Sequence, residues 1–578
     1  MVVSVRPSGK AAGEPFGLGI SCDESWDRAR PAWGVEMLGL MQDWPLLLHR
    51  IIDHAAIQFG DQEVVTRSVE GPIHRENYIE LRRRSLQVAK RLLADGIKTG
   101  DRVATLAWNT WRHMEIWYGV AGMGAIAHTV NPRLFPDQIA WIINHAEDRV
   151  MMTDLTFVPL LEKLADKLPT IEKYIILTDA AHMPETSLRN AVAYEDWLAE
   201  VDDDFAWLEL DEHTAAGLCY TSGTTGSPKG VLYSHRSNVI HAMQACFTGS
   251  LGFSADDTVL PVVPMFHANA WSCAYSLPMA GAKIVMPGPK LDGASVFDLM
   301  DEEGVSVSAG VPTVWKMLLD TMRERGRKPH ALRRVAIGGS ACPRAMIVSF
   351  ERDFGVQVGH AWGMTETSPI GTVGFVLKKG ANGLDEEGLF DLKAKQGSPP
   401  FGVELIITDD EDRRLPWDGK TFGRLKVRGP CITKSYFRED KPVLDKEGFF
   451  DTGDIASIDP DGTMCITDRS KDVIKSGGEW ISSVQIENIA MAHPDVAEAA
   501  VIGMPHPKWD ERPLLIVVPA KGKTPGRDDL LGFLSDKIAK WWMPDDVQLI
   551  EEIPHTAAGK INKLGLRKQF EDYKLPTA

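Results

Sequence analysis

Residues 220–230 are the stretch that most restricts how this chain can fold and what chemistry it can support. Their sequence is YTSGTTGSPKG, and apolar residues flank it at 218–219 and 231–233. Glycines let backbone N–H groups approach an anion closely, and the hydroxyl groups add further donors. Lys229 adds a positive charge. The pattern therefore predicts a strand, a phosphate-binding loop and a second strand.

This loop is not a Walker A P-loop. That motif needs Gly-x-x-x-x-Gly-Lys-Ser/Thr at the start of a helix. Here Pro228 precedes Lys229, Gly230 follows it, and the flanking residues favour strands. Short stretches rich in Gly, Ser and Thr are commonly flexible loops, but eleven residues in this order are more specific than that.

Length and charge narrow the class of protein. A chain of 578 residues is too long for one compact core, which predicts two or more domains. The formal net charge of −17 argues against a nucleic-acid partner. Polyanions such as ATP and CoA would need local basic patches, and 469–475 and 560–568 are the candidates.

The sequence also bears on the compartment. No apolar run approaches the roughly 18 residues that a transmembrane helix needs, and residues 1–33 lack the apolar core of a secretory signal. Seven cysteines are scattered singly, which does not suggest zinc or a disulfide framework. We expect a cytoplasmic enzyme. Residues 1–36 are expected to be a disordered extension, with Met37 as the native start.

Helical and strand patterns alternate from residue 37 to about residue 466. Strands are predicted at 103–107, 126–130, 150–152 and 174–177, with a helix at 111–124. Such alternation predicts parallel sheets with helices on both faces and ligands at the ends of strands. After residues 468–472, a small domain is predicted with helices at 486–493 and 525–540 and strands at 499–502 and 514–518.

The 220–230 stretch resembles the phosphate loop of the acyl-adenylate-forming superfamily, which includes acyl-CoA synthetases, peptide-synthetase adenylation domains and beetle luciferases. Further motifs in family order extend the resemblance over residues 46–573. It implies an α/β fold with a large N-terminal domain, residues 37–470, of parallel sheets flanked by helices plus a β-barrel-like subdomain. A small mobile α+β domain would follow at 471–578.

The second motif, 360–366, has an aromatic residue beside glycine, followed by Thr and Glu. Alone, such a stretch is commonly a buried aromatic in a turn. The resemblance implies instead that Trp362 stacks on adenine and that Thr365 contacts the α-phosphate. It also implies that Glu366 shares Mg²⁺ with Thr221. The family commonly has Tyr at the position of Trp362. The Trp ring can still stack on the adenine, but this chain has no phenol hydroxyl there.

Residues 450–454 predict a turn with two carboxylates, which is commonly a surface turn. The resemblance makes Asp454 the acceptor for both ribose hydroxyls, with Arg469 supporting the same sugar. The loop 338–341 would pass under the adenine. The nucleotide-binding set implied in this way is Ser222, Gly223, Thr224, Thr225, Gly226, Lys229, Gly339, Ser340, Ala341, His360, Ala361, Trp362, Gly363, Met364, Asp454, Arg469 and Lys475.

Two motifs lie near the C-terminus. The charged stretch 468–480 is of a kind that is usually a solvated face, but the resemblance implies a hinge at Lys471. The CoA-binding loop that would follow is Ser476, Gly477, Gly478 and Glu479. Lysines near a chain end are commonly mobile surface residues, yet residues 554–560 match the family pattern P-x-T-x-x-G-K. Lys560 is therefore the implied catalytic lysine, acting with Glu366, Thr221 and Thr365.

The stretch 261–271 is apolar with one His and one Trp, and a lone His there is commonly a core residue. The stretch closely resembles one in dimeric bacterial fatty acyl-CoA synthetases, in which the Trp gates the acyl tunnel. The resemblance implies a homodimer. The expected acyl pocket is formed by His267, Trp271, Gly310, Val311 and Pro312.

The implied reaction is that of an ATP-dependent acyl-CoA synthetase of fatty acid metabolism that uses Mg²⁺ and CoA. A carboxylate attacks the α-phosphorus of ATP and releases pyrophosphate, and the CoA thiol then releases AMP from the acyl adenylate. The motifs look similar to those of bacterial 3-methylmercaptopropionyl-CoA ligases, which favours a short or medium acid such as 3-(methylthio)propionate. One alternative is a medium- or long-chain fatty acid. Another is an amino-acid adenylating enzyme, although we identify neither its pocket Asp nor a carrier domain.

Overall fold

The computed structural model describes residues 39–221, 228–375, 378, 381–477, 479–555 and 561–578. The expected extension 1–36 and seven expected site residues lie outside this part of the chain: Ser222, Gly223, Thr224, Thr225, Gly226, Gly478 and Lys560. Contacts divide the chain into residues 1–44 and residues 45–578, and every described helix and strand lies in the second unit. The expected boundary between residues 470 and 471 stays a prediction.

The first sheet has seven strands in the order β7-β6-β5-β3-β4-β8-β9. Its strands are parallel except for β9, which pairs antiparallel with β8. The strand bounds are β3 (Arg102–Leu106), β4 (Ile126–Thr129), β5 (Val150–Thr153), β6 (Lys173–Ile176), β7 (Val192–Ala193), β8 (Ala215–Thr221) and β9 (Lys229–Ser234). The four predicted strands of this region are confirmed.

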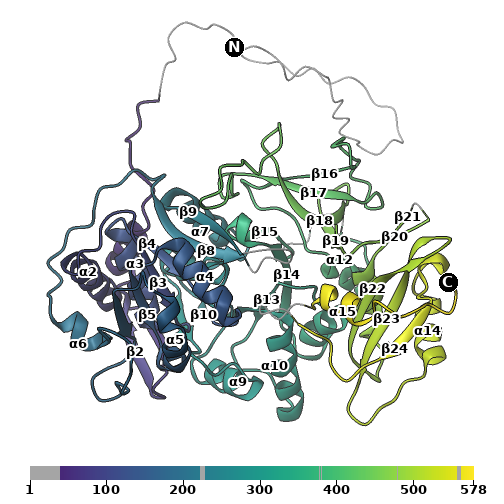
Figure 1. The fold of residues 1–578 in the computed structure, drawn as a ribbon, viewed down its shortest axis with the longest axis horizontal. Helices are drawn as coiled ribbons and strands as arrows, with labels where there is room; N and C mark the ends of the chain where they lie inside the picture. The colour runs from purple at the N-terminus through teal and green to yellow at the C-terminus, as the bar shows by residue number, and fades with distance from the viewer. Residues whose placement is uncertain (1–38, 222–227, 376–377, 379–380, 478, 556–560) are drawn as a thin grey trace, which may run out of the picture. The chain divides into compact units, whose positions relative to one another are not determined.

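The second sheet has eight strands in the order β15-β14-β13-β12-β10-β11-β1-β2. Figure 1 labels β2, β10, β13, β14 and β15 of this sheet. It is parallel at its centre and antiparallel at both edges. The strand bounds are β1 (Glu63–Arg67), β2 (Ile73–Asn77), β10 (Thr258–Pro261), β11 (Lys283–Met286), β12 (Val307–Gly310), β13 (Arg334–Ile337), β14 (Gln357–Gly363) and β15 (Ile370–Val373). The predicted parallel α/β architecture is confirmed.

Helices cover these two sheets. Their bounds are α1 (His49–Gln58), α2 (Tyr78–Ala94), α3 (Trp111–Gly122), α4 (Pro136–Ala146), α5 (Val158–Leu164), α6 (Tyr194–Ala199), α7 (His235–Cys246), α8 (Cys273–Ala280), α9 (Gly293–Glu302), α10 (Pro312–Arg325), α11 (Arg344–Val348) and α12 (Glu386–Ala394). Side-chain oxygens cap several of them; for example, Asn77 accepts from the Glu80 amide, and Thr110 accepts from the His113 amide. α3 is buried along its whole length and packs against α2.

A four-stranded antiparallel sheet follows, in the order β16-β17-β18-β19. Its strands are β16 (Glu404–Thr408), β17 (Gly423–Arg428), β18 (Phe450–Ile458) and β19 (Met464–Arg469). Apolar side chains of these strands form a core of their own, against which Trp362 and Met364 pack. This sheet occupies the place of the expected β-barrel-like subdomain.

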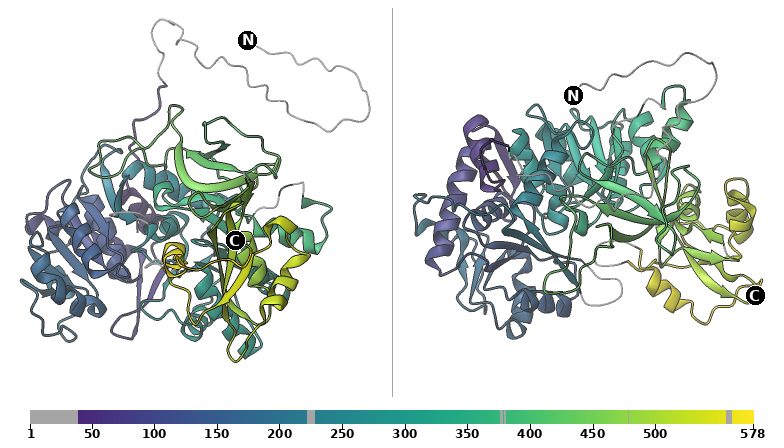
Figure 2. Two further views of the ribbon diagram at one scale, coloured as in Figure 1. Left: turned by 45° about the vertical axis from the view of Figure 1, so that its right-hand side comes forward. Right: turned by 90° about the horizontal axis from the view of Figure 1, so that it is seen from above.

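The C-terminal part is α+β, as predicted, and Figure 2 shows its sheet as separate from the green four-stranded sheet. Its elements are β20 (Ile474–Ser476), β21 (Glu479–Ile481), α13 (Ser483–Ala490), β22 (Val496–His506), β23 (Asp510–Pro519), α14 (Arg527–Ser535), β24 (Asp546–Leu549) and α15 (Lys563–Gln569). α13 begins earlier than predicted because the Ser482 hydroxyl accepts from the Gln485 amide and caps it. Among the described residues, none of the helices combines the length and apolar character that crossing a bilayer requires.

Candidate active site

The predicted strand–loop–strand unit is the β8–β9 hairpin at the edge of the first sheet. Thr221 and Lys229 are paired across the hairpin, so they close the phosphate loop from its two sides. The Lys229 side chain is half exposed. Its ammonium lies 4.5 Å from the ring centre of Tyr436 and 3.9 Å from the Glu439 carboxylate. The cation is therefore at the surface of the hairpin, within reach of a polyanion.

Glu366 lies in a short 3₁₀ turn, Thr365–Thr367, shortly after β14 in the second sheet. Its side chain is buried, and the Tyr436 hydroxyl donates to its Oε1 at 2.8 Å. Burial and the nearby carboxylate of Glu366 raise the pKa of Tyr436, so the phenol stays a proton donor at neutral pH. The Thr433 amide donates to the Glu366 carbonyl at 2.9 Å.

The segment that carries Tyr436 also reaches the phosphate hairpin. The Phe437 amide donates to the Gly230 carbonyl at 2.8 Å. A second link joins the first sheet to the turn after β14, because the Tyr233 hydroxyl on β9 donates to the Thr365 carbonyl at 2.8 Å. Thr221, Lys229, Thr365 and Glu366 are thus brought to one region where the sheets meet. Sequence reasoning used Tyr233 only as part of an apolar flank and gave it no role, and it missed Tyr436, which belongs to no motif that it used.

Trp362, Asp454 and Arg469 form a second group of predicted residues that the structure brings together. Asp454 and Arg469 lie opposite each other on β18 and β19, and the Arg469 Nε is 2.8 Å from Asp454 Oδ1. The Trp362 indole N–H donates to Asp454 Oδ2 at 2.9 Å. The Asp454 residue is only 2% exposed. Trp362 therefore orients the predicted ribose-binding carboxylate, a role beyond the stacking expected from sequence.

His360 has a supporting position on β14. Both ring nitrogens are occupied by protein: Nδ1 lies 2.9 Å from the Ala394 carbonyl, and the Cys342 amide donates to Nε2 at 3.3 Å. Burial lowers the pKa of His360 to about 4, so the ring is neutral at physiological pH and Nδ1 donates. A nucleotide contact at this position would have to use the backbone.

The expected adenine loop and acyl pocket are adjacent. A Cβ built on Gly338 would lie 2.9 Å from the Ala361 carbonyl and 3.0 Å from the Trp271 ring. A Cβ on Gly339 would lie 3.2 Å from Val311. Gly339 and Ser340 are exposed, with the Gly339 φ at +80°. Trp271 and Val311 thus lie beside the loop that would carry the adenine.

The Trp271 segment is held by a residue that sequence reasoning missed. Residues 268–272 all have positive φ and form a left-handed turn. Before this turn, the buried Asn109 side chain donates to the carbonyls of Pro261 and Val263, both at 2.9 Å. Its Oδ1 accepts from the Met265 amide at 2.7 Å. No sequence signal distinguishes this Asn from an ordinary loop residue.

Other residues expected in the acyl pocket and the CoA-binding loop are held by contacts within their own segments or with neighbouring strands. Pro312 is the first residue of α10, and a Cβ on Gly310 would meet the Trp315 ring at 2.8 Å. Lys475 and Ser476 lie on β20, where Arg512 donates to the Ser476 hydroxyl at 3.2 Å. The Gly477 φ is +61°, and its amide donates to the Trp509 carbonyl at 2.9 Å.

The expectation of a basic patch at residues 560–568 is wrong for two of its charges. Lys563 is buried, with its ammonium 2.8 Å from Glu487 Oε1. The Arg567 guanidinium lies 2.8 Å from Asp472 Oδ1. These charges are neutralised by acids of the same chain instead of facing a ligand. Lys563 connects α15 to α13, and Arg567 connects it to the segment around Lys471.

The resemblance implies that Glu366 holds Mg²⁺. On that basis we expect Tyr436→Phe to raise the Mg²⁺ concentration needed for half-maximal activity by about tenfold, because a hydrogen bond to a charged group contributes roughly 1.5 kcal/mol or more. The measurement is the initial rate against Mg²⁺ at saturating ATP. Tyr233→Phe is the matched control. Its lost hydroxyl bonds a backbone carbonyl, so thermal stability should fall while the Mg²⁺ dependence stays unchanged. Identical Mg²⁺ curves for wild type and Tyr436→Phe would contradict the role of Tyr436.

Comparisons with known proteins extend over both parts of the chain. The model of the family described as AMP-binding enzyme matches residues 52–437, and that of the AMP-binding enzyme C-terminal domain matches residues 485–560. The chain is 49% identical to the 3-methylmercaptopropionyl-CoA ligase of Ruegeria pomeroyi, covering 93% of this chain and 99% of that protein. It is 47% identical to the long-chain-fatty-acid–CoA ligase of Thermus thermophilus, covering 92% and 97% respectively. The crystal structure of ATP-bound MatB from Rhodopseudomonas palustris matches with a TM-score of 0.76 at 25% identity, covering 91% and 100%.

Proposed function

This chain belongs to the AMP-binding enzyme family, and from this premise we propose that it converts a short- or medium-chain carboxylic acid, 3-(methylthio)propionate in particular, to its CoA thioester. It is an acid–thiol ligase of the AMP-forming class. The observation that carries the proposal is the meeting of the phosphate hairpin with Glu366 at the junction of the two large sheets. The Trp362–Asp454–Arg469 group supports it as a ribose site.

The first half-reaction must bring two anions together at the α-phosphorus. The repulsion between a carboxylate and a polyphosphate is large where water is excluded. In our proposal, Lys229 and the hydroxyl-rich loop bind the phosphates, Thr365 contacts the α-phosphate, and Lys560 bridges the attacking carboxylate and that phosphate. The reaction depends on position and charge more than on a nucleophilic side chain.

Glu366 and Thr221 are the proposed holders of Mg²⁺. A carboxylate and a hydroxyl are oxygen ligands of the kind that this ion prefers, and Mg²⁺ commonly takes one or two carboxylates plus substrate phosphates. The Tyr436 hydroxyl fixes one oxygen of the Glu366 carboxylate at 2.8 Å, which orients the group. When bound, Mg²⁺ would neutralise phosphate charge.

The second half-reaction needs a path for the CoA thiol. We assign the hinge to Lys471 and the CoA-facing loop to Ser476, Gly477, Gly478 and Glu479. The turn at Gly477 supports this assignment, because its φ of +61° and the Trp509 ring 2.8 Å from a built Cβ both require glycine there. A cytoplasmic location, expected from the singly scattered cysteines, and a homodimer, implied by the resemblance alone, are part of the same proposal.

The choice of acid rests on the comparisons with relatives. The 49% identity to a 3-methylmercaptopropionyl-CoA ligase favours the same small acid. The second candidate, a medium- or long-chain fatty acid, is favoured by the 47% identity to a long-chain ligase.

The test is the rate of acid-dependent AMP release with butyrate, 3-(methylthio)propionate, octanoate and palmitate. We expect kcat/KM for 3-(methylthio)propionate to exceed that for palmitate by about tenfold or more, since a poorly fitting apolar chain costs ~1–3 kcal/mol. Acid-dependent ATP–pyrophosphate exchange, followed by a CoA-dependent thioester assay, separates the ligase from an amino-acid adenylating enzyme. A higher kcat/KM for palmitate would overturn the choice of acid but not the ligase class.

A further inference from the structure

Asn109 lies between β3 and α3, beyond the carboxyl end of β3 in the first sheet, and its side chain reaches the second sheet. Its carboxamide NH₂ group donates to the carbonyls of Pro261 and Val263, both at 2.9 Å. Its Oδ1 accepts from the Met265 amide at 2.7 Å. The residue is buried, so these three contacts replace the water that an amide would otherwise bind. One side chain therefore holds residues 261–265, the end of β10 and the loop that follows it.

The backbone on both sides of Asn109 is itself fixed. The Trp108 amide donates to the Asp154 carboxylate at 2.6 Å, and the Trp111 amide donates to the Thr66 hydroxyl at 3.2 Å. Asp154 directly follows β5 in the first sheet, and Thr66 lies on β1 in the second. The Asn109 side chain therefore extends from a backbone that both large sheets hold in place.

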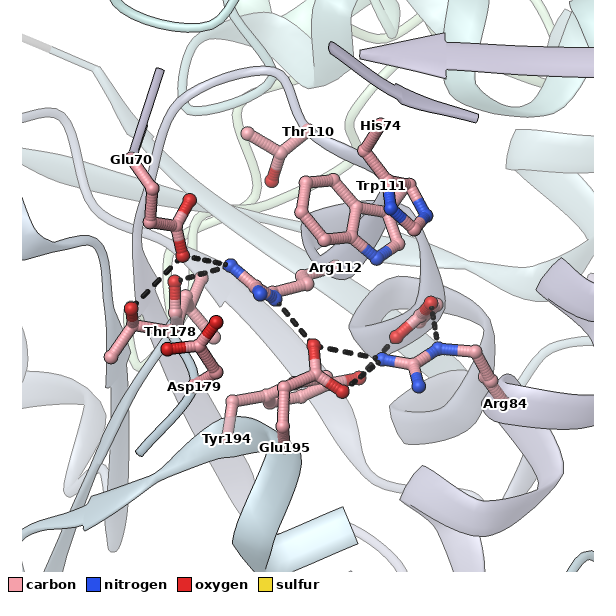
Figure 3. A network of polar contacts seen from close by, with 12 residues as sticks. Glu70, His74, Arg84, Thr110, Trp111, Arg112, Thr178, Asp179, Tyr194 and Glu195 are labelled. Atoms are coloured by element: carbon pink, nitrogen blue, oxygen red, sulfur yellow. Dashed lines mark hydrogen bonds and ion pairs between the residues drawn. The ribbon is translucent and has the colours of Figure 1, made fainter. Parts of the chain in front are cut away.

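A network of ion pairs holds the start of α3, two residues further on (Figure 3). The Arg112 guanidinium donates to Glu195 and to Glu70, both at 2.7 Å. Arg84 on α2 donates to the same Glu195 carboxylate at 2.9 Å. The network is largely shielded from water, where ion pairs are screened less than at the surface. It ties α3 to α2 and α6, so the helix that follows Asn109 has a fixed position.

The segment that Asn109 holds also contacts the strand that carries Gly310, an expected acyl-pocket residue. The amides of Val262 and Val263 donate to the Ala309 carbonyl at 2.9 Å and 3.1 Å. Ala309 precedes Gly310 at the end of β12. A shift of residues 261–265 would therefore strain or break the contacts beside Gly310.

The same segment leads to Trp271 through two consecutive turns. The His267 amide donates to the Pro264 carbonyl at 3.1 Å, and the Ala270 amide donates to the His267 carbonyl at 3.2 Å. The left-handed turn 268–272 follows, and its five residues, none of them glycine, all have positive φ. Such a backbone persists only where the surrounding structure holds it. The position of the buried Trp271 ring thus depends on how firmly residues 261–265 are anchored.

We propose that Asn109 is a positioning residue that determines acid selectivity, because it fixes residues 261–265 and, through them, the turn that carries Trp271. The inference rests on the proposed ligase function but not on which acid is preferred. Loss of the carboxamide should let the turn take several positions, so the acyl pocket should discriminate less between acids. The proposed nucleotide contacts lie on other segments and should be unaffected.

The first measurement is kcat/KM for butyrate, 3-(methylthio)propionate, octanoate and palmitate in Asn109→Ala. We expect the ratio of kcat/KM between the best and the poorest acid to fall about tenfold, chiefly through a higher KM for the best acid. The KM for ATP should stay within about threefold of wild type. Tyr78→Phe is the matched control, because the buried Tyr78 hydroxyl also donates to a backbone carbonyl, that of Ala282. Both variants should lower the Tm, but Tyr78→Phe should leave the acid ratio unchanged.

A double-mutant cycle with Trp271→Ala tests whether Asn109 acts through the turn. In the Trp271→Ala background, adding Asn109→Ala should change the acid ratio by less than about twofold. Independent, multiplicative effects of the two substitutions would overturn the proposal. An unchanged acid ratio in Asn109→Ala would also overturn it while leaving the ligase function intact. If the wild type released AMP with no acid of the panel, the proposed function would fall, and this inference with it.

Asn109→Asp keeps the proposal testable should Asn109→Ala fail to fold. It has the same shape, keeps an oxygen for the Met265 amide and, as a buried acid that holds its proton, can still donate to one of the two carbonyls. The acid ratio should then fall by only about threefold. Amide hydrogen exchange in residues 261–272 should be faster than in wild type in this variant and unchanged in Tyr78→Phe. Wild-type selectivity or wild-type exchange in Asn109→Asp would contradict the positioning role.

Discussion

Lys560→Ala is expected to lower the rate of acyl-adenylate formation by about 10²–10³-fold, because a positioned cation that stabilises transition-state charge in a dry site contributes roughly 3–4 kcal/mol. Thioester formation from a preformed acyl adenylate should stay within about threefold of wild type. In the proposed mechanism the small domain rotates at Lys471 between the two half-reactions. Lys560 then acts only in the first, and the CoA-facing loop 476–479 acts in the second. The two halves are measured separately, by acid-dependent ATP–pyrophosphate exchange and by single-turnover reaction of acyl adenylate with CoA.

Lys568→Ala is the matched control for this variant. Lys568 is an exposed lysine of the same terminal segment, and its removal should leave both half-reactions unchanged. Lys563 is unsuitable as a control, since its ammonium is buried beside Glu487 and its loss would leave a buried carboxylate unpaired. An equal loss of both half-reactions in Lys560→Ala would remove the domain-rotation part of the mechanism.

Asp454→Ala is expected to raise the KM for ATP by about 100-fold, which corresponds to roughly 3 kcal/mol. Two losses combine in this variant. The acceptor proposed for the ribose hydroxyls disappears, and the Trp362 N–H and the Arg469 guanidinium lose the carboxylate that holds them. The measurement is the KM for ATP at saturating acid and CoA, together with the fold as judged by thermal unfolding.

A ribose contact can be separated from a general loss of structure by using 2′-deoxy-ATP. Wild type should prefer ATP over 2′-deoxy-ATP, and Asp454→Ala should bind the two nucleotides alike. Asp451→Ala is the control, because that carboxylate lies on the same strand but pairs with Arg424. An unchanged KM for ATP in Asp454→Ala would refute the ribose role.

Much of the fold followed from local sequence patterns. The two strands on either side of residues 222–227, the parallel strands of the first sheet and the α+β C-terminal part were all predicted and are confirmed. These features depend on hydrophobic period, glycines and hydroxyl-rich turns, which act over a few residues. One error was local, and the other arose from a contact between residues distant in sequence. The helix α13 begins at Ser483 because of the Ser482 cap, and Lys563 proved to be a buried partner of Glu487 rather than a surface charge.

Only the tertiary structure decided the contacts between residues that are distant in sequence. Tyr436 lies 70 residues from the Glu366 carboxylate to which it donates, and Trp362 lies 92 residues from Asp454. Asn109 holds the carbonyl of Pro261 across 152 residues. The sequence by itself determined which side chains the chain possesses and which strands and helices carry them. Only the packing of the sheets decided which of those side chains meet, because a hydrogen bond or ion pair depends on distance in space and leaves no local pattern in the sequence.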